Sequence, residues 1–201
     1  MNEQKAGQTA SDWTKVFAVC GSIRAASVNL NILQLINRIL PASVDLTIYQ
    51  RLAELPPFNP DFDVEASDYQ NSAVDQWRQD LRAADAVIIC TPEYAHGVPG
   101  VLKNALDWVV SSGELIDKPV AVITASPSES GGEMAMAALL PTIKVMSARI
   151  SASETLKMPF VRKKIDQNGN ALDAETPEAL KLLLTSLLDK INQVRREQTN
   201  N

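Results

Sequence analysis

Short apolar runs alternate along this chain with longer segments of helical periodicity, and this alternation limits the fold more than any other feature. The apolar runs are Lys15–Cys20, Ala86–Cys90 and Pro119–Thr124. Val44–Tyr49 alternates apolar and polar residues like a strand, and Ala148–Ser151 is a weak candidate for an edge strand. The helical segments are Ser27–Leu40, Ser67–Ala84, Pro99–Ser111, Gly132–Ser147 and Thr176–Val194. Continuously apolar runs are typical of strands that are covered on both faces. Parallel strands joined by right-handed crossover helices then predict an α/β fold, a three-layer doubly wound domain with a five-stranded parallel sheet.

Three residues refine the helix predictions. We expect Thr176 to cap the last helix and Pro177 to open it. Pro141 lies inside the fourth helical segment, where it predicts a kink or a break.

The length and composition of the chain fit one globular domain. It has 201 residues, of which 45% are hydrophobic and 21% are charged. We expect the domain to span residues 13–195, with flexible polar tails at 1–12 and 196–201. The net charge of −5 argues against nucleic acid or an anionic membrane surface as the main partner. The polar start of the chain lacks the apolar core of a signal peptide, and no apolar run reaches the roughly 18 residues of a membrane span.

The two cysteines, Cys20 and Cys90, each end an apolar run. They lie far apart in the sequence and form no CxxC pair, so we expect reduced, buried thiols at strand ends in a cytoplasmic protein. With one histidine, two separated cysteines and no clustered carboxylates, the sequence indicates no metal site.

Parallel sheets of this kind bind ligands beyond the carboxyl ends of their strands. The first such loop, Gly21–Asn29, reads GSIRAASVN and leads into a helix N-terminus, whose N–H groups and dipole favour an anion. Its hydroxyls and Arg24 suit a phosphate monoester better than a pyrophosphate, and it has neither a GxGxxG nor a Walker A pattern. Taken alone, the same loop could equally be an ordinary turn with a capping serine and a surface arginine.

Two further loops follow apolar runs. Thr91–Gly100 (TPEYAHGVPG) is stiffened by its prolines, so it could present backbone groups to a flat polar ring with Tyr94 at one edge. Ser126–Gly132 (SPSESGG) ends in two glycines that allow a close backbone approach before a helix. The alternatives are a rigid turn for the first and a flexible surface turn for the second.

His96 is the single histidine and lies in the second loop. No Ser, Cys or Asp stands at a spacing diagnostic of a catalytic triad. We therefore expect His96 to line a pocket or to be exposed, rather than to act as a general acid, and we assign no catalytic side chain.

These segments resemble the NADPH-dependent FMN reductase family, which includes bacterial quinone and chromate reductases and some azoreductases. The most specific match is TPEYAHGVPGVLKNALDW at 91–108, which is similar to the family's PEY–PG–LKNA–DW signature. GSIRAASVN matches the family's GS-x-R-x-x-S-x-N phosphate loop, and SPSESGG lies where the family has a Ser-Pro-rich loop ending in two glycines. The resemblance covers about Val16 to Leu188 and implies a flavodoxin-like fold.

Carried over by position, the resemblance implies an FMN site. The FMN phosphate would be held by Ser22, Arg24, Ser27 and Asn29, the isoalloxazine would lie against Pro92, Glu93, Tyr94 and Ala95, and the other side would be closed by Ser126, Gly131 and Gly132. The resemblance also implies NADPH or NADH as co-substrate and a small electron acceptor, such as a quinone, an azo compound or a metal oxyanion, with ping-pong transfer through FMN. Because the family is typically dimeric or tetrameric, we expect a homodimer or homotetramer. Trp108 and Met134–Met136 could supply contact surface or could equally belong to the core.

The chain departs from the family pattern in two places. The residue after PEY, often Asn in the family, is Ala95, and the segment after Gly132 contains Pro141 and lacks the family's usual Gln and Arg residues. Two other functions remain open: a non-enzymatic flavodoxin-like electron carrier and a flavin-binding regulatory protein. Carriers usually have a strongly acidic surface and a phosphate loop with hydroxyls only, which this chain does not have.

Overall fold

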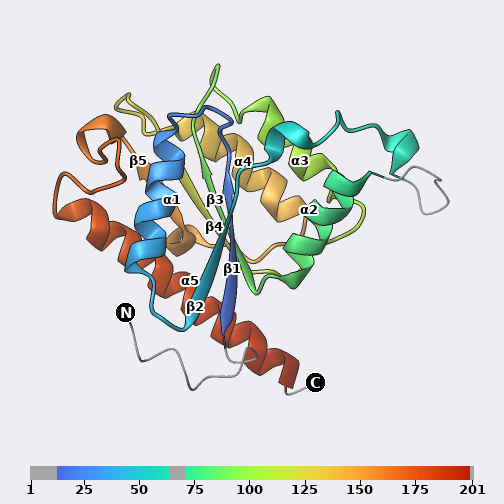
Figure 1. Cartoon of the computed structure of the whole chain (residues 1–201). Helices are drawn as coiled ribbons and strands as arrows, with labels where there is room; N and C mark the ends of the chain where they lie inside the picture. Colours follow the sequence, from blue (N-terminus) through green and yellow to red (C-terminus); the bar gives the residue numbers. More distant parts are fainter. Residues whose placement is uncertain (1–12, 64–70, 200–201) are drawn as a thin grey trace.

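A computed structural model describes residues 13–63 and 71–199 and shows a five-stranded parallel sheet between two layers of helices (Figure 1). The strands are β1 (Thr14–Cys20), β2 (Val44–Tyr49), β3 (Ala86–Thr91), β4 (Val120–Ala125) and β5 (Thr155–Met158). Their order across the sheet is β2-β1-β3-β4-β5, and every pairing is parallel. The strand order therefore reverses between β1 and β3, which confirms the predicted flavodoxin-like doubly wound fold.

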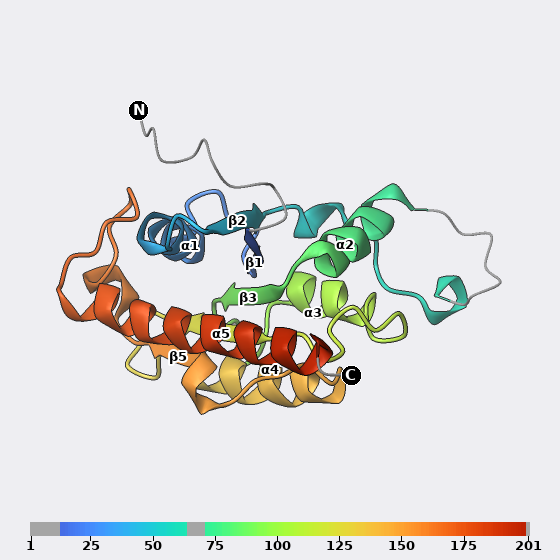
Figure 2. The ribbon, with the colours of Figure 1, turned by 90° about the horizontal axis from the view of Figure 1, so that it is seen from below.

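The described α-helices cover both faces of the sheet. They are α1 (Val28–Ile39), α2 (Ser72–Ala83), α3 (Gly100–Asp107), α4 (Glu133–Val145) and α5 (Glu175–Thr199). On one face, α1 and α5 bury side chains such as Ile36 and Leu187, and on the other α2, α3 and α4 bury Trp77, Leu106 and Leu139. All residues of β3 and β4 are buried, as their uninterrupted apolar sequences predicted. Helix α5 runs across the molecule and ends near the amino ends of the strands (Figures 1 and 2).

The fifth strand was placed wrongly. We predicted it at Ala148–Ser151, but Arg149 forms only an isolated bridge with Pro119, and the strand is β5. β5 pairs with the last four residues of β4 at the edge of the sheet. It is short and carries the exposed Lys157, so it lacks the apolar run that marks the inner strands.

Several helix predictions also need correction. Thr176 lies inside α5, and the cap is Asp173, whose carboxylate accepts a hydrogen bond from the Thr176 N–H at 2.7 Å. Because α5 extends to Thr199, residues 196–199 of the expected tail are helical. Pro141 lies inside α4 without ending it, because it is on the exposed face, where water can reach the Ala137 carbonyl that loses its N–H partner. The expected tail at 1–12 and the first part of the second predicted helix, 67–70, lie outside the described residues.

Both cysteines are free and buried, as predicted. Cys20 and Cys90 are paired positions at the ends of β1 and β3. Burial raises the pKa of both thiols, so neither is a ready nucleophile. Among the helices in the described part of the chain, none is long and apolar enough to cross a membrane.

Candidate functional site

A cavity of about 880 Å³ opens at the carboxyl ends of the strands, the upper edge of the sheet in Figure 1. Most of the predicted site residues line it, namely Ser22, Arg24, Ser27, Asn29, Pro92, Glu93, Tyr94 and Ser126. They belong to the loops after β1, β3 and β4 or, in the case of Asn29, to the first turn of α1, so the structure brings the three predicted segments together.

The loop after β1 ends at a helix N-terminus that has no side-chain cap. Ser27 is the N-cap residue of α1, but its side chain accepts no hydrogen bond from the first turn, and that turn contains no acidic residue. Ser27 and Asn29 are buried beside the cysteines, and the Cys90 thiol donates to Asn29 Oδ1 at 3.5 Å. The first N–H groups of α1 are therefore left for an external anion.

Arg24 lies at the edge of this cavity with its side chain exposed. Its guanidinium makes no ion pair or hydrogen bond with any residue that the structure describes. The Arg24 backbone N–H donates to Ser22 Oγ at 3.3 Å, and the same oxygen lies 3.5 Å from the Tyr94 hydroxyl. The loop is thus held in place while the guanidinium stays available for a ligand.

The second loop contains a tight two-residue turn. The N–H of Tyr94 and the N–H of Gly97 each donate to the other residue's carbonyl at 3.0 Å. The two residues between them, Ala95 and His96, have positive φ angles of 49° and 60°. This is the backbone of a type I′ turn, which favours Asn and Gly. The turn keeps Tyr94 at the cavity, while Ala95 is exposed and does not line it, so the predicted contact of Ala95 with the ring has no support here.

The Glu93 side chain joins the second loop to α4. Its Oε2 accepts hydrogen bonds from the backbone N–H groups of Met134 and Ala135, at 2.8 and 3.1 Å, and so caps the first turn of α4. His96 Nδ1 lies 3.7 Å from Glu93 Oε1, and its side chain is 84% exposed. His96 is therefore exposed, one of the two expected placements.

The two glycines of the third loop do not line the cavity but allow its backbone to pack. Gly131 and Gly132 have positive φ angles of 62° and 83°. A Cβ atom on Gly131 would lie 2.9 Å from the Pro159 nitrogen, and one on Gly132 would lie 2.9 Å from the Thr124 Cβ. The close approach of these glycines is therefore to the protein's own chain, at β4 and just after β5, and their place in a ligand site stays a prediction.

A fourth wall of the cavity comes from the segment between β5 and α5, which the sequence analysis missed. Its lining residues are Val161, Arg162, Ile165, Asp166, Gln167, Asn168 and Leu172. The segment begins with the 3-10 turn η5 (Val161–Lys163). The rule that ligands bind beyond the carboxyl ends of strands would have pointed to it, had β5 been placed at Thr155–Met158.

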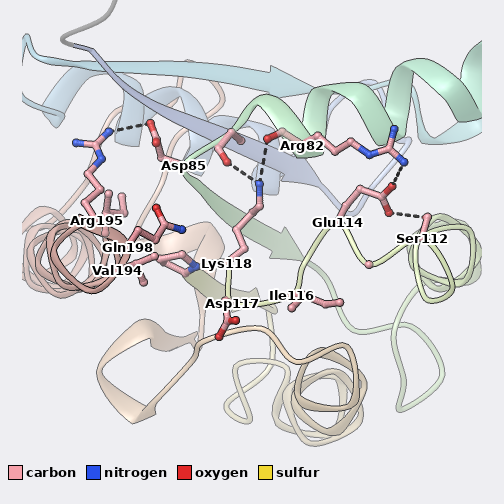
Figure 3. A pocket seen from close by; sticks show the side chains of 14 residues that line it. Arg82, Asp85, Ser112, Glu114, Ile116, Asp117, Lys118, Val194, Arg195 and Gln198 are labelled. Atoms are coloured by element: carbon pink, nitrogen blue, oxygen red, sulfur yellow. Dashed lines mark hydrogen bonds and ion pairs between the residues drawn. The ribbon is translucent and has the colours of Figure 1, made fainter. Parts of the chain in front are cut away.

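A second cavity, of about 370 Å³, lies at the amino end of β4 and is lined by charged residues (Figure 3). Lys118 Nζ donates to backbone carbonyls at the end of α2, and burial lowers its pKa. Arg82 pairs with Glu114 at 2.6 Å, and Arg195 pairs with Asp85 at 3.0 Å. These charged groups pair with one another or with backbone carbonyls, and they join α2 and α5 to the segments just before β3 and β4. No group of three or more potential metal ligands occurs within residues 13–63 and 71–199.

Comparisons with known proteins show the family of this chain and its fold. The family model for NADPH-dependent FMN reductase matches residues 14–161. A quinone reductase of Escherichia coli K12 is 30% identical over 92% of this chain and 99% of its own. An NAD(P)H-dependent FMN reductase of Pseudomonas aeruginosa is 29% identical with the same coverage. The solved structure of a flavoenzyme NAD(P)H:(acceptor) oxidoreductase from Paracoccus denitrificans superposes with a TM-score of 0.79 at 23% identity, covering 90% of this chain and 98% of that one.

Proposed function

This chain belongs to the NADPH-dependent FMN reductase family, and we propose that it passes electrons from NAD(P)H through FMN to a quinone or a similar small acceptor by a ping-pong mechanism. Its cofactors are FMN and a nicotinamide nucleotide. An azo compound or a metal oxyanion is a further candidate acceptor. A reducing compartment such as the cytoplasm fits the two free thiols.

The uncapped N-terminus of α1 beside the free Arg24 is the observation that carries this proposal. A phosphate monoester satisfies both, because it accepts hydrogen bonds from first-turn N–H groups and pairs with a guanidinium. The cavity of about 880 Å³ is within the range of roughly 300–1,000 Å³ for small-molecule sites. The residues present therefore fit FMN.

In this proposal each loop has a separate task. The hydroxyls of Ser22 and Ser27, with Asn29, bind the phosphate together with Arg24. Pro92 and Tyr94 lie against the isoalloxazine, and Ser126 closes the opposite side. Glu93, Gly131 and Gly132 act indirectly, by fixing the backbone of these walls. The N–H groups of Tyr94, Gly97, Ser126, Ser128 and Gly131 bond within the protein, so the remaining backbone N–H groups at 93–97 and 126–132 would stabilise negative charge on the ring. No side chain then has to act as acid or base.

When bound, FMN supplies the redox chemistry, taking a hydride from the nicotinamide nucleotide and passing two electrons to the acceptor in a separate step. The protein's part is to bind both small molecules in turn at the same open side of the cavity. A single shared place for donor and acceptor makes the kinetics ping-pong, because the oxidised nicotinamide nucleotide must leave before the acceptor can bind.

Two measurements test the proposal. The purified protein should be yellow or bind FMN stoichiometrically by calorimetry, and the absence of any flavin binding would overturn it. Initial rates measured with NAD(P)H and a quinone, without any partner reductase, should give parallel double-reciprocal lines. Intersecting lines would contradict the shared site, and no NAD(P)H oxidation without a partner reductase would favour an electron carrier.

A further inference from the structure

Only two arginines in this chain have unpaired side chains among the residues that the structure describes, and both line the same cavity. The chain has nine arginines. The paired ones contact a carboxylate or a backbone carbonyl, and they are Arg38, Arg51, Arg78, Arg82, Arg149, Arg195 and Arg196. The other two are Arg24, in the loop after β1, and Arg162, in the turn η5 after β5.

Arg162 extends from a firmly held turn. The neighbouring Val161 is fully buried, and its backbone N–H donates to the Ser126 carbonyl at 3.1 Å. The N–H of Phe160 donates to the Ser128 carbonyl at 3.1 Å, and Phe160 has a positive φ of 50°, a conformation that a bulky residue adopts only when its surroundings impose it. The exposed guanidinium of Arg162 therefore projects from a fixed point on the cavity wall.

The carboxylates of the cavity are already engaged. Glu93 accepts two backbone N–H groups of α4. Asp166 accepts the backbone N–H groups of Asn168 and Asn170 at 2.8 and 2.7 Å and the Asn170 side chain at 3.0 Å, and these hydrogen bonds lower its pKa. Each carboxylate has partners of its own, whereas both arginines of the cavity are left for an anion from outside.

We propose that Arg162 is a second phosphate-binding arginine of this cavity, in addition to Arg24, and that its guanidinium pairs with a phosphate monoester. This inference rests on the proposed function, which brings two such groups to the site, the 5′-phosphate of FMN and the 2′-phosphate of NADPH. The planar guanidinium suits either one, because it makes paired, charge-assisted hydrogen bonds to phosphate oxygens.

The test compares each phosphorylated ligand with its counterpart that lacks the phosphate monoester. Apoprotein is titrated with FMN and riboflavin by flavin fluorescence, and FMN-loaded protein is titrated with NADP⁺ and NAD⁺ by calorimetry. Arg162→Ala should reduce the preference for the phosphorylated member of at least one pair by about 10- to 100-fold. A fall in the FMN/riboflavin ratio assigns the phosphate to the flavin, and a fall in the NADP⁺/NAD⁺ ratio assigns it to the nicotinamide nucleotide. Arg162→Lys should recover only part of the preference.

Lys163→Ala is the matched control. Lys163 is the next cation in the same turn, but it lies over the Phe160 ring, with Nζ 5.5 Å from the ring centroid, and it does not line the cavity. This variant should leave both ratios unchanged. The inference is overturned if Arg162→Ala changes neither ratio, or if it weakens both members of each pair equally. Wild-type protein that binds no flavin would instead contradict the proposed function, so the two failures are distinguishable.

Discussion

At the scale of single residues, substitution of Arg24 should weaken binding of the flavin phosphate without weakening binding of the flavin ring. Arg24→Ala should weaken FMN binding by about 10- to 100-fold and leave riboflavin nearly unchanged, because only FMN has a phosphate for the guanidinium. Arg24→Lys should recover part of the loss, since the ammonium lacks the planar fork. Titration of both ligands at low and high salt measures the effect, and the preference for FMN should fall as salt rises. Equal weakening of both ligands would show that Arg24 supports the shape of the loop instead.

His96 should contribute little to catalysis. Its side chain is 84% exposed, and its Nδ1 lies 3.7 Å from Glu93 Oε1, which is too long for a hydrogen bond that would orient the imidazole. His96→Ala should keep FMN bound and reduce kcat/KM only modestly. A loss beyond about 100-fold, the low end of general acid–base contributions, would contradict this expectation.

At the scale of elements, the Glu93 carboxylate connects two walls of the cavity through α4. Glu93→Ala leaves the N–H groups of Met134 and Ala135 without their acceptor, so the free energy of unfolding should fall by about 0.5–2 kcal/mol. Because the third loop leads into α4, FMN and riboflavin should both bind more weakly, and to the same extent. Glu93→Gln keeps an acceptor oxygen and is the control. Urea unfolding with the two flavin titrations measures these effects, and a loss confined to FMN would refute the indirect role.

The 3-10 turn η4 (Ala152–Glu154) holds a buried carboxylate against α5. Burial alone would raise the pKa of Glu154, but hydrogen bonds from Ser151, Ser186 and Lys190 outweigh it and lower the pKa to about 2. A carboxyl group with a lowered pKa in the folded state stabilises the protein above its unfolded pKa near 4.5, and this contribution is lost as the pH falls through about 2.

At about 1.4 kcal/mol per pH unit, this contribution is at most about 3.5 kcal/mol. Glu154→Gln should therefore lower the free energy of unfolding at pH 7 and make its decline between pH 5 and 2 shallower. Urea unfolding curves across that range measure both effects. Wild-type and variant curves that run parallel throughout the range would show that Glu154 does not titrate as described.

At the scale of the whole molecule, we expect a homodimer or homotetramer. Trp108 is buried, and its indole N–H donates to the Pro56 carbonyl, so it is part of the core rather than a contact. Met136 is also buried, which leaves Met134, 50% exposed, as the candidate from the predicted stretch. Sedimentation at micromolar concentration should show an oligomer, and Met134→Asp should weaken it. A wild-type monomer under these conditions would refute the prediction.

Much of this molecule could be predicted from local sequence patterns. The inner strands can be predicted from apolar runs, because a strand buried on both faces consists almost entirely of apolar residues. The helices can be predicted from apolar residues at helical spacing, because a helix buried on one face repeats them every three or four positions. The carboxyl-edge rule then places Arg24, Tyr94 and Ser126 around one cavity. Neither step needs contacts between distant residues.

Other features depend on contacts between residues far apart in the chain, and no local sequence pattern predicts them. β5 is a strand because it pairs with β4, although its own sequence lacks the apolar run that would predict a strand. The Glu93 carboxylate accepts hydrogen bonds from α4 because the fold places the first-turn N–H groups of that helix next to it. In the sequence Arg162 is one of three consecutive cations, and it lines the cavity only because the Ser126 carbonyl holds its turn there.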